Sequence, residues 1–529
     1  MSAFQHLDSL AAHSDVYKDS QHVAVIDMGS NSFRLIVIEY VPNLSFRVVD
    51  EVRETVRLSE GMADTNIMRA AAMDRAARAV QIYAAFCKAS GISDIMAVGT
   101  SAIRDAKNQQ RFLARLQAET GIAVRVLSGY EEAYYGYLAA VNCTTLKEGY
   151  VLDMGGGSIQ ISRVQDRQIG DSISFPYGAV RMTERFLKSD PATYRETDAL
   201  SSFLRKEFSA LKWYKAKQGM QIVGEGGGLR QVGRLVQKMI GYPLDTMHGY
   251  QITLAQMKTV RDELARRSVA DRKKMPGMKP DRADIALGAT VVLCEALEAG
   301  GFDRITISSQ GVREGLFYER FLKYEQDDAV PLFEDVRQSS VYNLGHLYRY
   351  QEKHAKHIAS LTLSMFDQLP RAVHQCRPAD RDLLWAASML HDIGVAIDYH
   401  DHHKHSAYLI LNGSLPGFTH REIALIALLV RYHRKGAPTL DEFAPMMEAG
   451  DDRRLIQLCA LLRLAEQIDR SRDGVAQTVT LNMGGDWAQL ELGVRGDGQV
   501  ALWSVDRHRD VFQQAFGLEL EVTMAPSNA

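Results

Sequence analysis

The sequence lacks several features that mark specialised classes of protein. Its five cysteines lie far apart and form no Cys-x-x-Cys pair, a pattern that indicates reduced thiols rather than a disulfide framework. No apolar run approaches the ~18 residues that a membrane-spanning helix needs. The first twenty residues lack the basic segment and the apolar core of a signal peptide. We therefore expect a cytoplasmic protein without a membrane span.

An excess of positive charge is absent as well. The 62 Lys and Arg residues are outnumbered by 65 Asp and Glu residues, which gives a net charge of −3. A broadly basic surface for nucleic acid is therefore not expected. A polyanion that binds this protein must be held by a local site, because the surface as a whole does not attract it.

The 529 residues contain two styles of sequence. From about residue 22 to 325, short apolar strands alternate with helical patterns, which predicts an α/β fold with largely buried sheets. Beyond 330 the strand signals nearly vanish, and amphipathic helices are followed by a short β tail. We expect four domains: an α/β lobe at 22–135, a second α/β lobe at 136–325, a helical domain at 326–475 and a small C-terminal α+β tail at 476–529.

Two strand–turn–strand segments share an unusual lead sequence. "VAVIDMGSNSFRLIVIE" (23–39) and "YVLDMGGGSIQIS" (150–162) each place Asp-Met-Gly at the end of an apolar strand. Small residues there let a phosphate approach the backbone closely, and the leading acids, Asp27 and Asp153, can hold Mg²⁺ or water. The candidate phosphate-binding residues are Gly29, Ser30, Asn31, Ser32, Gly155, Gly156, Gly157 and Ser158. The alternative is that each segment is an ordinary glycine hairpin.

These loops and three further motifs together carry a family resemblance. "DMGSNSFR", "GTSAIRDAKN", "LSGYEEAYYGY", "DMGGGS" and "GEGGGLR" occur in the order of the exopolyphosphatase/guanosine pentaphosphate phosphohydrolase (Ppx/GppA) family. The sequence resembles that family over about 22–325, and its helical half resembles the long members that carry an HD-type domain. The resemblance implies two actin-like lobes of the acetate and sugar kinase/Hsp70/actin superfamily, followed by an all-α HD-like domain and the β tail.

The resemblance also implies roles for single residues. Arg104 in "GTSAIRDAKN" follows a strand end, where a guanidinium can bind a phosphate with two hydrogen bonds. Glu131 in "LSGYEEA" best matches the glutamate that serves the family as general base, and Glu132 is the alternative. Both glutamates begin a helix, so capping of that helix is the plainer interpretation. Gly226 and Gly227 in "GEGGGLR" are expected to bind phosphate where the lobes meet.

One position departs from the family. Where relatives usually carry a glutamate two residues after the glycine-loop serine, this sequence has Gln160. An amide can orient water but cannot accept its proton. The catalytic work is then expected to fall more heavily on Asp27, Asp153 and Glu131.

The helical half contains an HD-type pattern. His354 and the pair His391–Asp392 have the spacing of metal ligands in HD phosphohydrolases. The fourth ligand falls on Glu466 instead of an aspartate, with Asp469 one turn on, and the longer carboxylate compromises the geometry. The two interpretations are a functional metal site and a scaffold that serves only as a lid and a wall along the substrate.

Local clusters of basic residues favour the second interpretation, a wall along the substrate. They lie in "YHDHHKHSAYLI" and "VRYHRKG" and would steer a polyanion to this surface. The predicted chain-binding residues are His402, His403, Lys404, His405, Arg431, His433, Arg434 and Lys435. The alternative is that they belong to ordinary solvated loops.

The resemblance implies an exopolyphosphatase that removes the terminal phosphate of inorganic polyphosphate, processively and with Mg²⁺, or Mn²⁺ in its place. The predicted metal ligands are Asp27, Asp153 and Glu131. Removal of the 5′-phosphate of guanosine pentaphosphate (pppGpp) is the alternative within the family. A nucleotide-binding switch without turnover and an HD phosphodiesterase are the alternatives outside it. The resemblance also suggests a homodimer.

Overall fold

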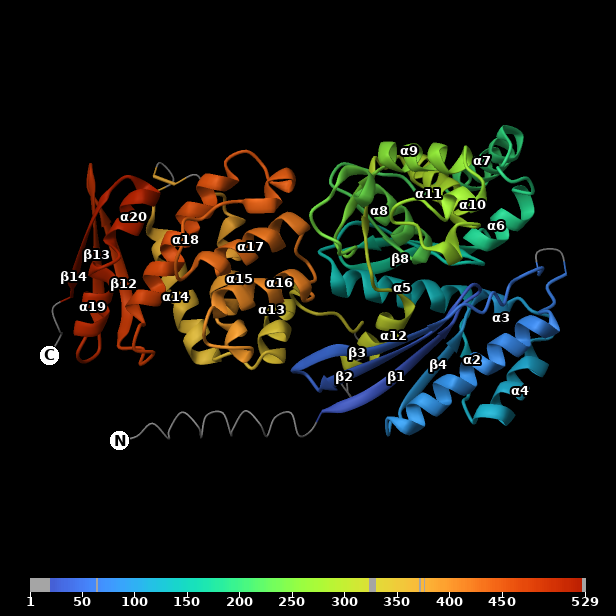
Figure 1. The fold of residues 1–529 in the computed structure, drawn as a ribbon, viewed down its shortest axis with the longest axis horizontal. Helices are drawn as coiled ribbons and strands as arrows, with labels where there is room; N and C mark the ends of the chain where they lie inside the picture. The colour runs from blue at the N-terminus through green and yellow to red at the C-terminus, as the bar shows by residue number, and fades with distance from the viewer. Residues whose placement is uncertain (1–19, 63–64, 323–329, 371–372, 375, 526–529) are drawn as a thin grey trace. The chain divides into compact units, whose positions relative to one another are not determined.

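The computed structural model describes residues 20–62, 65–322, 330–370, 373–374 and 376–525. The first nineteen residues, to which the signal-peptide prediction applies, lie outside this description. The chain forms two compact units, the first ending at Val336 and the second beginning at Arg337 (Figure 1). Within the residues that the structure describes, no helix is both long and apolar enough to cross a bilayer.

The first unit contains two sheets, one for each predicted lobe (Figure 1). The first sheet has the order β3-β2-β1-β4-β5. Its strands are β1 (Gln21–Met28), β2 (Phe33–Val41), β3 (Ser45–Glu54), β4 (Ile95–Gly99) and β5 (Val124–Val126). Ala24 and Ile26 of β1 pack into the core on one face, and Val23 and Val25 pack into the core on the other. The strand is therefore apolar throughout because both of its faces are covered.

The second sheet repeats the design of the first. Its order is β10-β11-β9-β6-β7-β8. Its strands are β6 (Gly149–Met154), β7 (Ile159–Gln165), β8 (Gln168–Phe175), β9 (Gln221–Glu225), β10 (Gln251–Thr253) and β11 (Arg304–Ile307). Asp153 lies opposite Gln160 in the β6–β7 hairpin, as Asp27 lies opposite Arg34 in the β1–β2 hairpin. The two strand–turn–strand segments that share Asp-Met-Gly are therefore equivalent hairpins of two similar sheets.

Two helices join the lobes. α5 (Gly129–Cys143) and α12 (Val312–Phe321) pack against each other, and their core includes Val25 of the first sheet and Val151 of the second. The predicted lobe boundary at 135/136 therefore falls inside α5, and the end of the predicted second lobe returns to β1. The other helices of this unit are α2 (Ala70–Ala89), α3 (Ser101–Arg104), α4 (Gln109–Thr120), α6 (Ala179–Phe186), α7 (Tyr194–Ser209), α8 (Gly227–Ile240), α9 (Leu254–Ala265), α10 (Val269–Arg272), η2 (Pro280–Arg282) and α11 (Ala286–Gly300).

The first unit extends beyond the predicted boundary at 325/326, which itself lies outside the described residues. The Asn142 side chain donates to the Pro331 carbonyl over 2.9 Å and accepts from the Phe333 amide over 2.9 Å. Arg167 donates to the Phe333 carbonyl over 2.7 Å. The segment that carries these residues therefore belongs to the α/β unit.

The second unit is helical and ends in a small sheet. Its helices are α13 (Val336–Leu347), α14 (Glu352–Gln368), α15 (Asp380–Leu390), η3 (Ile393–Ala396), α16 (His402–Asn412), α17 (His420–Tyr432), η4 (Asp441–Met446) and α18 (Asp451–Ile468). The tail follows as β12 (Ala476–Met483), β13 (Trp487–Val494), α19 (Gln499–Asp506), α20 (Arg509–Phe516) and β14 (Glu519–Met524). β12 packs on α14 and α20 packs on α18, so the tail and the helices form one body.

Candidate active site

A cavity of about 130 Å³ lies where the turns of the two duplicated hairpins meet. Both predicted phosphate loops contribute to its wall. The predicted residues that line it are Asp27, Gly29, Ser30, Asn31, Ser32, Asp153, Gly155, Gly156, Gly226 and Gly227. The other residues predicted for this site, Arg104, Glu131, Gly157 and Ser158, do not line it. We call this cavity the cleft.

The glycines of the second loop let the two loops touch. A Cβ on Gly156 would lie 3.2 Å from Ser30 Cβ and 3.3 Å from the Asn31 amide nitrogen. A Cβ on Gly157 would lie 2.5 Å from Ser101 Oγ and 2.6 Å from Ser30 Oγ. Part of the reason for three consecutive glycines is therefore the close approach of one loop to the other, in addition to any approach of phosphate.

Two half-buried aspartates, Asp27 and Asp153, lie at the ends of the equivalent strands β1 and β6. Burial raises the pKa of Asp27, and Asp27 Oδ1 has no hydrogen-bond partner among the described residues. Burial likewise raises the pKa of Asp153 to about 6, with a smaller contribution from the charge of Asp27. A buried, unpartnered carboxylate oxygen suits a hard cation such as Mg²⁺. The residues present therefore fit the predicted ion.

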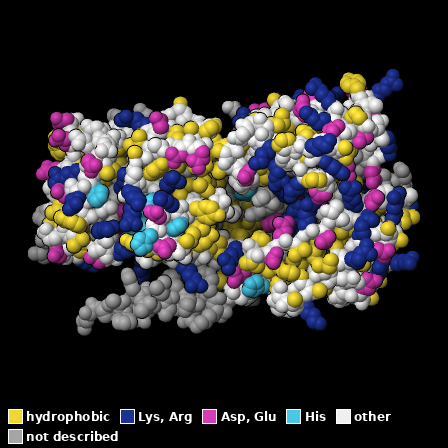
Figure 2. Space-filling view, viewed as in Figure 1, with side chains coloured by type: hydrophobic (Ala, Val, Ile, Leu, Met, Phe, Trp, Pro, Cys, Tyr) yellow, Lys and Arg dark blue, Asp and Glu magenta, His cyan; other side chains and the backbone are white. Residues whose placement is uncertain are grey.

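Four arginines line the cleft, and sequence reasoning identified none of them. They are Arg34, Arg230, Arg282 and Arg313. Burial, together with the charges of Arg230 and Arg313, lowers the pKa of Arg34 to about 9. Burial also lowers the pKa of Arg282 to about 10. Figure 2 shows Lys and Arg side chains gathered where the lobes of this unit meet. Guanidiniums held together in this way favour a multiply charged anion between them.

A signal for two of these arginines was present in the sequence. Arg34 ends the motif "DMGSNSFR" and Arg230 ends "GEGGGLR". Arg282 and Arg313 come from segments far along the chain, near η2 and at the start of α12. Gly227 makes room for one of them, because a Cβ there would lie 2.4 Å from Arg282 Nη2.

The two glutamates at the start of α5 have different places, and Glu131, predicted as the general base, does not line the cleft. Glu131 forms a capping box with Ser128 and an ion pair with Arg125 at the surface. The hydrogen bond from Arg125 and those from Ser128 lower its pKa to about 2. Glu132, the alternative, lines the cleft with its side chain only 7% exposed. Burial raises its pKa to about 7 although the charge of Arg104 acts against this.

Arg104 holds Glu132 instead of lining the cleft. Its Nη1 donates to Glu132 Oε2 over 2.8 Å and to the Leu127 carbonyl over 3.0 Å. The predicted direct grip on a phosphate is thus replaced by a contact with the buried carboxylate. Arg104 positions Glu132 and partly offsets the cost of burying its charge.

Gln160 supports the same carboxylate from the other side. Its Nε2 donates to Ser158 Oγ over 3.0 Å, and Ser158 Oγ approaches Glu132 Oε1 at 3.4 Å. Because the amide uses a lone pair of the Ser158 oxygen, the hydroxyl proton is free to point at Glu132. Gln160, which stands where the family usually has a glutamate, therefore still contributes to an ordered contact with Glu132 through Ser158.

The predicted chain-binding surface of the helical unit is only partly present. His403 and His433 are buried, with exposed fractions of 3% and 2%, so they cannot contact a passing polyanion. His402, predicted for the same surface, is buried as well. Lys404, Arg431, Arg434 and Lys435 are exposed, and His405 is half-buried. Lys404 and Lys435 both pair with Asp401, at 2.9 and 3.3 Å.

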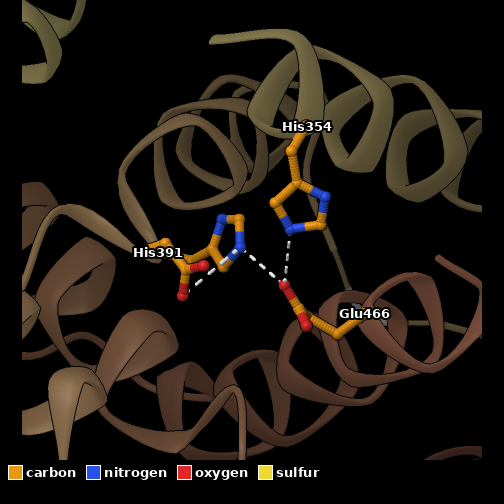
Figure 3. Close-up of side chains that lie close together, drawn as sticks. His354, His391 and Glu466 are labelled. Carbon is orange, nitrogen blue, oxygen red and sulfur yellow. Dashed lines mark hydrogen bonds and ion pairs between the residues drawn. The ribbon is translucent and has the colours of Figure 1, made fainter. Parts of the chain in front are cut away.

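The residues of the HD-type pattern lie together inside the helical unit. Side chains of His354, His391, Asp392 and Glu466 come within reach of one another (Figure 3), and His402 and His433 adjoin them through Asp392. We call these residues the histidine cluster. Asp469 hydrogen-bonds His354 over 2.8 Å. Sequence reasoning placed the first four together but assigned the last two histidines to the surface.

The sequence matches models of known protein families and a known relative. The Ppx/GppA phosphatase family model matches residues 36–324, and the model of domain III of Ppx/GppA phosphatases matches residues 336–499. The chain is 27% identical over 488 residues to a guanosine-5′-triphosphate,3′-diphosphate pyrophosphatase of Vibrio vulnificus, a match that covers 92% of this chain and 93% of that protein.

Solved structures give the same result for the α/β unit. The crystal structure of the Aquifex aeolicus member of the Ppx/GppA family is similar with 29% identity and a TM-score of 0.50, over 58% of this chain and 100% of that one. An exopolyphosphatase of Cytophaga hutchinsonii shares the fold with 24% identity and a TM-score of 0.53, over 57% of this chain and 98% of that one. With two acid-led loops facing one arginine-lined cleft and a family match over more than half its length, the chain belongs to the Ppx/GppA phosphatase family.

Proposed function

We propose that this chain is an exopolyphosphatase that removes the terminal phosphate of inorganic polyphosphate. The observation that carries the proposal is the cleft, where four arginines surround open space beside two half-buried aspartates. A phosphate chain is negatively charged along its length, so neighbouring phosphates can each meet a guanidinium. An anhydride at the end of such a chain would lie beside Glu132, Asp27 and Asp153.

Glu132 is the proposed general base. Water attacks the terminal phosphorus, Glu132 takes a proton from that water, and the bond between the phosphorus and its bridging oxygen breaks. The bridging oxygen leaves with the shortened chain, and orthophosphate is released. The arginines offset the charge that develops on the phosphate oxygens. A pKa of about 7 suits a carboxylate that accepts a proton near neutral pH.

Asp27 and Asp153 are the proposed Mg²⁺ ligands, because both line the cleft and Asp27 Oδ1 has no hydrogen-bond partner among the described residues. When bound, the ion would neutralise phosphate charge and hold the substrate in place. Glu131, predicted as a third ligand, is engaged at the surface with Arg125 and has no part in this proposal.

The lining of the cleft favours an inorganic chain over a nucleotide. Among the described residues that line it, none is aromatic, so a guanine would find no stacking surface there. Hydrolysis of guanosine pentaphosphate is the second candidate. It is favoured by the name of the Vibrio vulnificus relative, which matches this chain over nearly the whole length of both proteins.

Phosphate release separates the candidates. Long-chain polyphosphate and guanosine pentaphosphate would be compared at equal concentrations of cleavable ends, with Mg²⁺ and after chelation. We expect the higher kcat/KM for polyphosphate and no release without the ion. A higher kcat/KM for guanosine pentaphosphate would favour the second candidate. Release from neither substrate would favour a binding switch without turnover.

A further inference from the structure

Glu225 is a buried carboxylate that has no part in the mechanism above. It ends β9, and it is 0% exposed. Neither Oε1 nor Oε2 has a hydrogen-bond partner within the part of the chain that the structure describes. Burial, together with the charges of Asp153 and Glu314, raises the pKa of Glu225 well above its ordinary value. A polar group buried without a partner is costly, so this position calls for a partner from outside the chain.

Strand pairing places Glu225 next to Asp153. The strands β9 and β6 run parallel, and Glu225 and Asp153 are partners in their register. On the other side of Asp153, its partner in the antiparallel strand β7 is Gln160. Residues in register on neighbouring strands project from the same face of a sheet. Asp153 therefore has an amide as its neighbour on one side and the unpartnered carboxylate of Glu225 on the other.

Two glycines leave space beside Glu225 Oε2. A Cβ on Gly136 of α5 would lie 3.1 Å from this oxygen and 3.8 Å from Asp153 Oδ2. A Cβ on Gly311, which lines the cleft, would lie 3.5 Å from the same Glu225 oxygen. The space beside Gly136 therefore faces one oxygen of each carboxylate, and Gly311 places it next to the wall of the cleft. Glycine inside a helix is less favourable than alanine, so α5 keeps this space at the expense of helix stability.

No side chain supplies a positive charge in contact with Glu225 among the described residues. Arg230 is the cation whose charge opposes the rise in the pKa of Glu225. Its Nη1, however, donates to the Ser309 carbonyl over 3.1 Å and lies 3.5 Å from the Ser308 carbonyl. Oxygen atoms without nitrogen or sulfur donors favour a hard cation such as Mg²⁺. The partner that fits Glu225 is therefore such an ion, or a water molecule bound to it.

We propose that Glu225 holds the divalent cation of the cleft together with Asp153, through a water ligand of the ion that occupies the space beside Gly136. Mg²⁺ keeps several of its waters when a protein binds it, and these waters donate hydrogen bonds to nearby carboxylates. Glu225 is thus a positioning residue, because it acts on the ion through the water. The inference rests on the proposed function, since it adds a residue to the Mg²⁺ site assigned there.

Binding of Mg²⁺ without substrate tests the proposal. The full-length chain would be stripped with a chelator and titrated with Mg²⁺ by isothermal calorimetry. Mg²⁺ is the suitable probe because it prefers oxygen ligands to the imidazoles of the helical unit. Glu225→Gln should raise the Kd for Mg²⁺ by ~10-fold, as is typical when an outer partner of a metal site is lost. Glu295→Gln is the matched control, because Glu295 is 2% exposed and lies on α11, outside the cleft.

Filling the space tests the same water from the other side. Gly136→Ala should raise the Kd for Mg²⁺ by a similar factor, ~10-fold, because its methyl group takes the place of the water. The double variant should bind no more weakly than either single variant, since both changes remove one interaction. Circular dichroism and Tm in chelator would show that each variant folds. Gly136→Ala carries the test if Glu225→Gln does not fold.

Two kinds of failure are distinguishable. A wild-type Kd in folded Glu225→Gln or folded Gly136→Ala, or additive effects in the double variant, would overturn the role of Glu225. A wild-type chain that binds no Mg²⁺ would overturn it as well. Release of phosphate from polyphosphate by the wild-type chain is measured separately. Its absence would reject the proposed function, whereas equal Kd values with normal release would reject only the inference about Glu225.

Discussion

The cleft and the histidine cluster both bury carboxylates, but they surround them with different cations. In the cleft the acids Asp27 and Asp153 face arginines, whose charge is permanent, and about 130 Å³ of space remains. In the cluster, Asp392 and Glu466 face imidazoles, and although burial acts against it, the charges of these two carboxylates raise the pKa of His391 to about 9. The first arrangement gathers four guanidiniums around open space and suits an anion. In the second, Arg472 and histidine rings supply the positive charge, and the charge of the rings depends on pH.

The largest effect is expected from the buried glutamate of the cleft. Glu132→Gln should lower kcat by ~10³-fold, because the amide cannot accept the proton of the attacking water. Phosphate release under saturating substrate measures this, and Tm shows whether the fold survives.

The neighbouring glutamate is the matched control. Glu131→Gln should keep kcat within about threefold of wild type, because glutamine still fills the capping box and the side chain lies outside the cleft. If Glu131→Gln loses turnover while Glu132→Gln keeps it, the assignment of the base is reversed.

The next largest effect is expected from the arginines of the cleft, which make it a site for an anion. Arg230→Gln should lower kcat/KM by ~10²-fold, as expected for the loss of a charged hydrogen bond to phosphate. Arg47→Gln is the control, since Arg47 is exposed and pairs only with Glu39 among the described residues. Equal loss in the two variants would show that general charge, and not the cleft, attracts the substrate.

The pH dependence of kcat tests whether Glu132 is the titrating group of the cleft. Because burial raises the pKa of Glu132 to about 7, its carboxylate is protonated below that pH and cannot act as a base. The kcat of the wild-type enzyme should therefore fall about tenfold per pH unit on the acid side of pH 7 and level off above it. A profile that stays flat down to pH 5 would exclude Glu132 as the titrating group.

The smallest effect is expected from the contact between the loops. Gly156→Ala should lower kcat/KM by about fivefold, because its Cβ would press on Ser30 and shift one lobe against the other. Gly155→Ala is the control, since its Cβ would meet only the Ser158 carbonyl oxygen at 3.5 Å, an ordinary contact, and Ser158 Oγ at 4.0 Å. Similar kcat/KM values in both variants would show that the loops accommodate the added methyl group, and would contradict the prediction.

Much of the cleft could be predicted because its loops are local in sequence. A strand, an acid and a run of small residues specify a turn wherever they occur, so Asp27 and Asp153 were found. The choice between Glu131 and Glu132 could not be made in the same way. Successive residues of a helix point about 100° apart, and the direction of the cleft depends on how α5 packs.

The same reason explains the histidines that were misplaced. "DHHKH" contains one lysine and three histidines and suggests a solvated surface, yet α16 buries His402 and His403 while Lys404 is exposed. Their partner Asp392 comes from the turn after α15, and His433 follows α17. Only the packing of these helices brings together groups that are separate in sequence.

The two equivalent hairpins differ at one position, and this makes the two sides of the cleft chemically different. Arg34 and Gln160 hold the same position in the two repeats, opposite Asp27 and Asp153. One repeat thus places a fixed cation at this point, and the other places an amide that supports Ser158 next to Glu132. A nearly symmetric frame therefore differs at equivalent points, with a guanidinium on one side of the cleft and a supported carboxylate on the other.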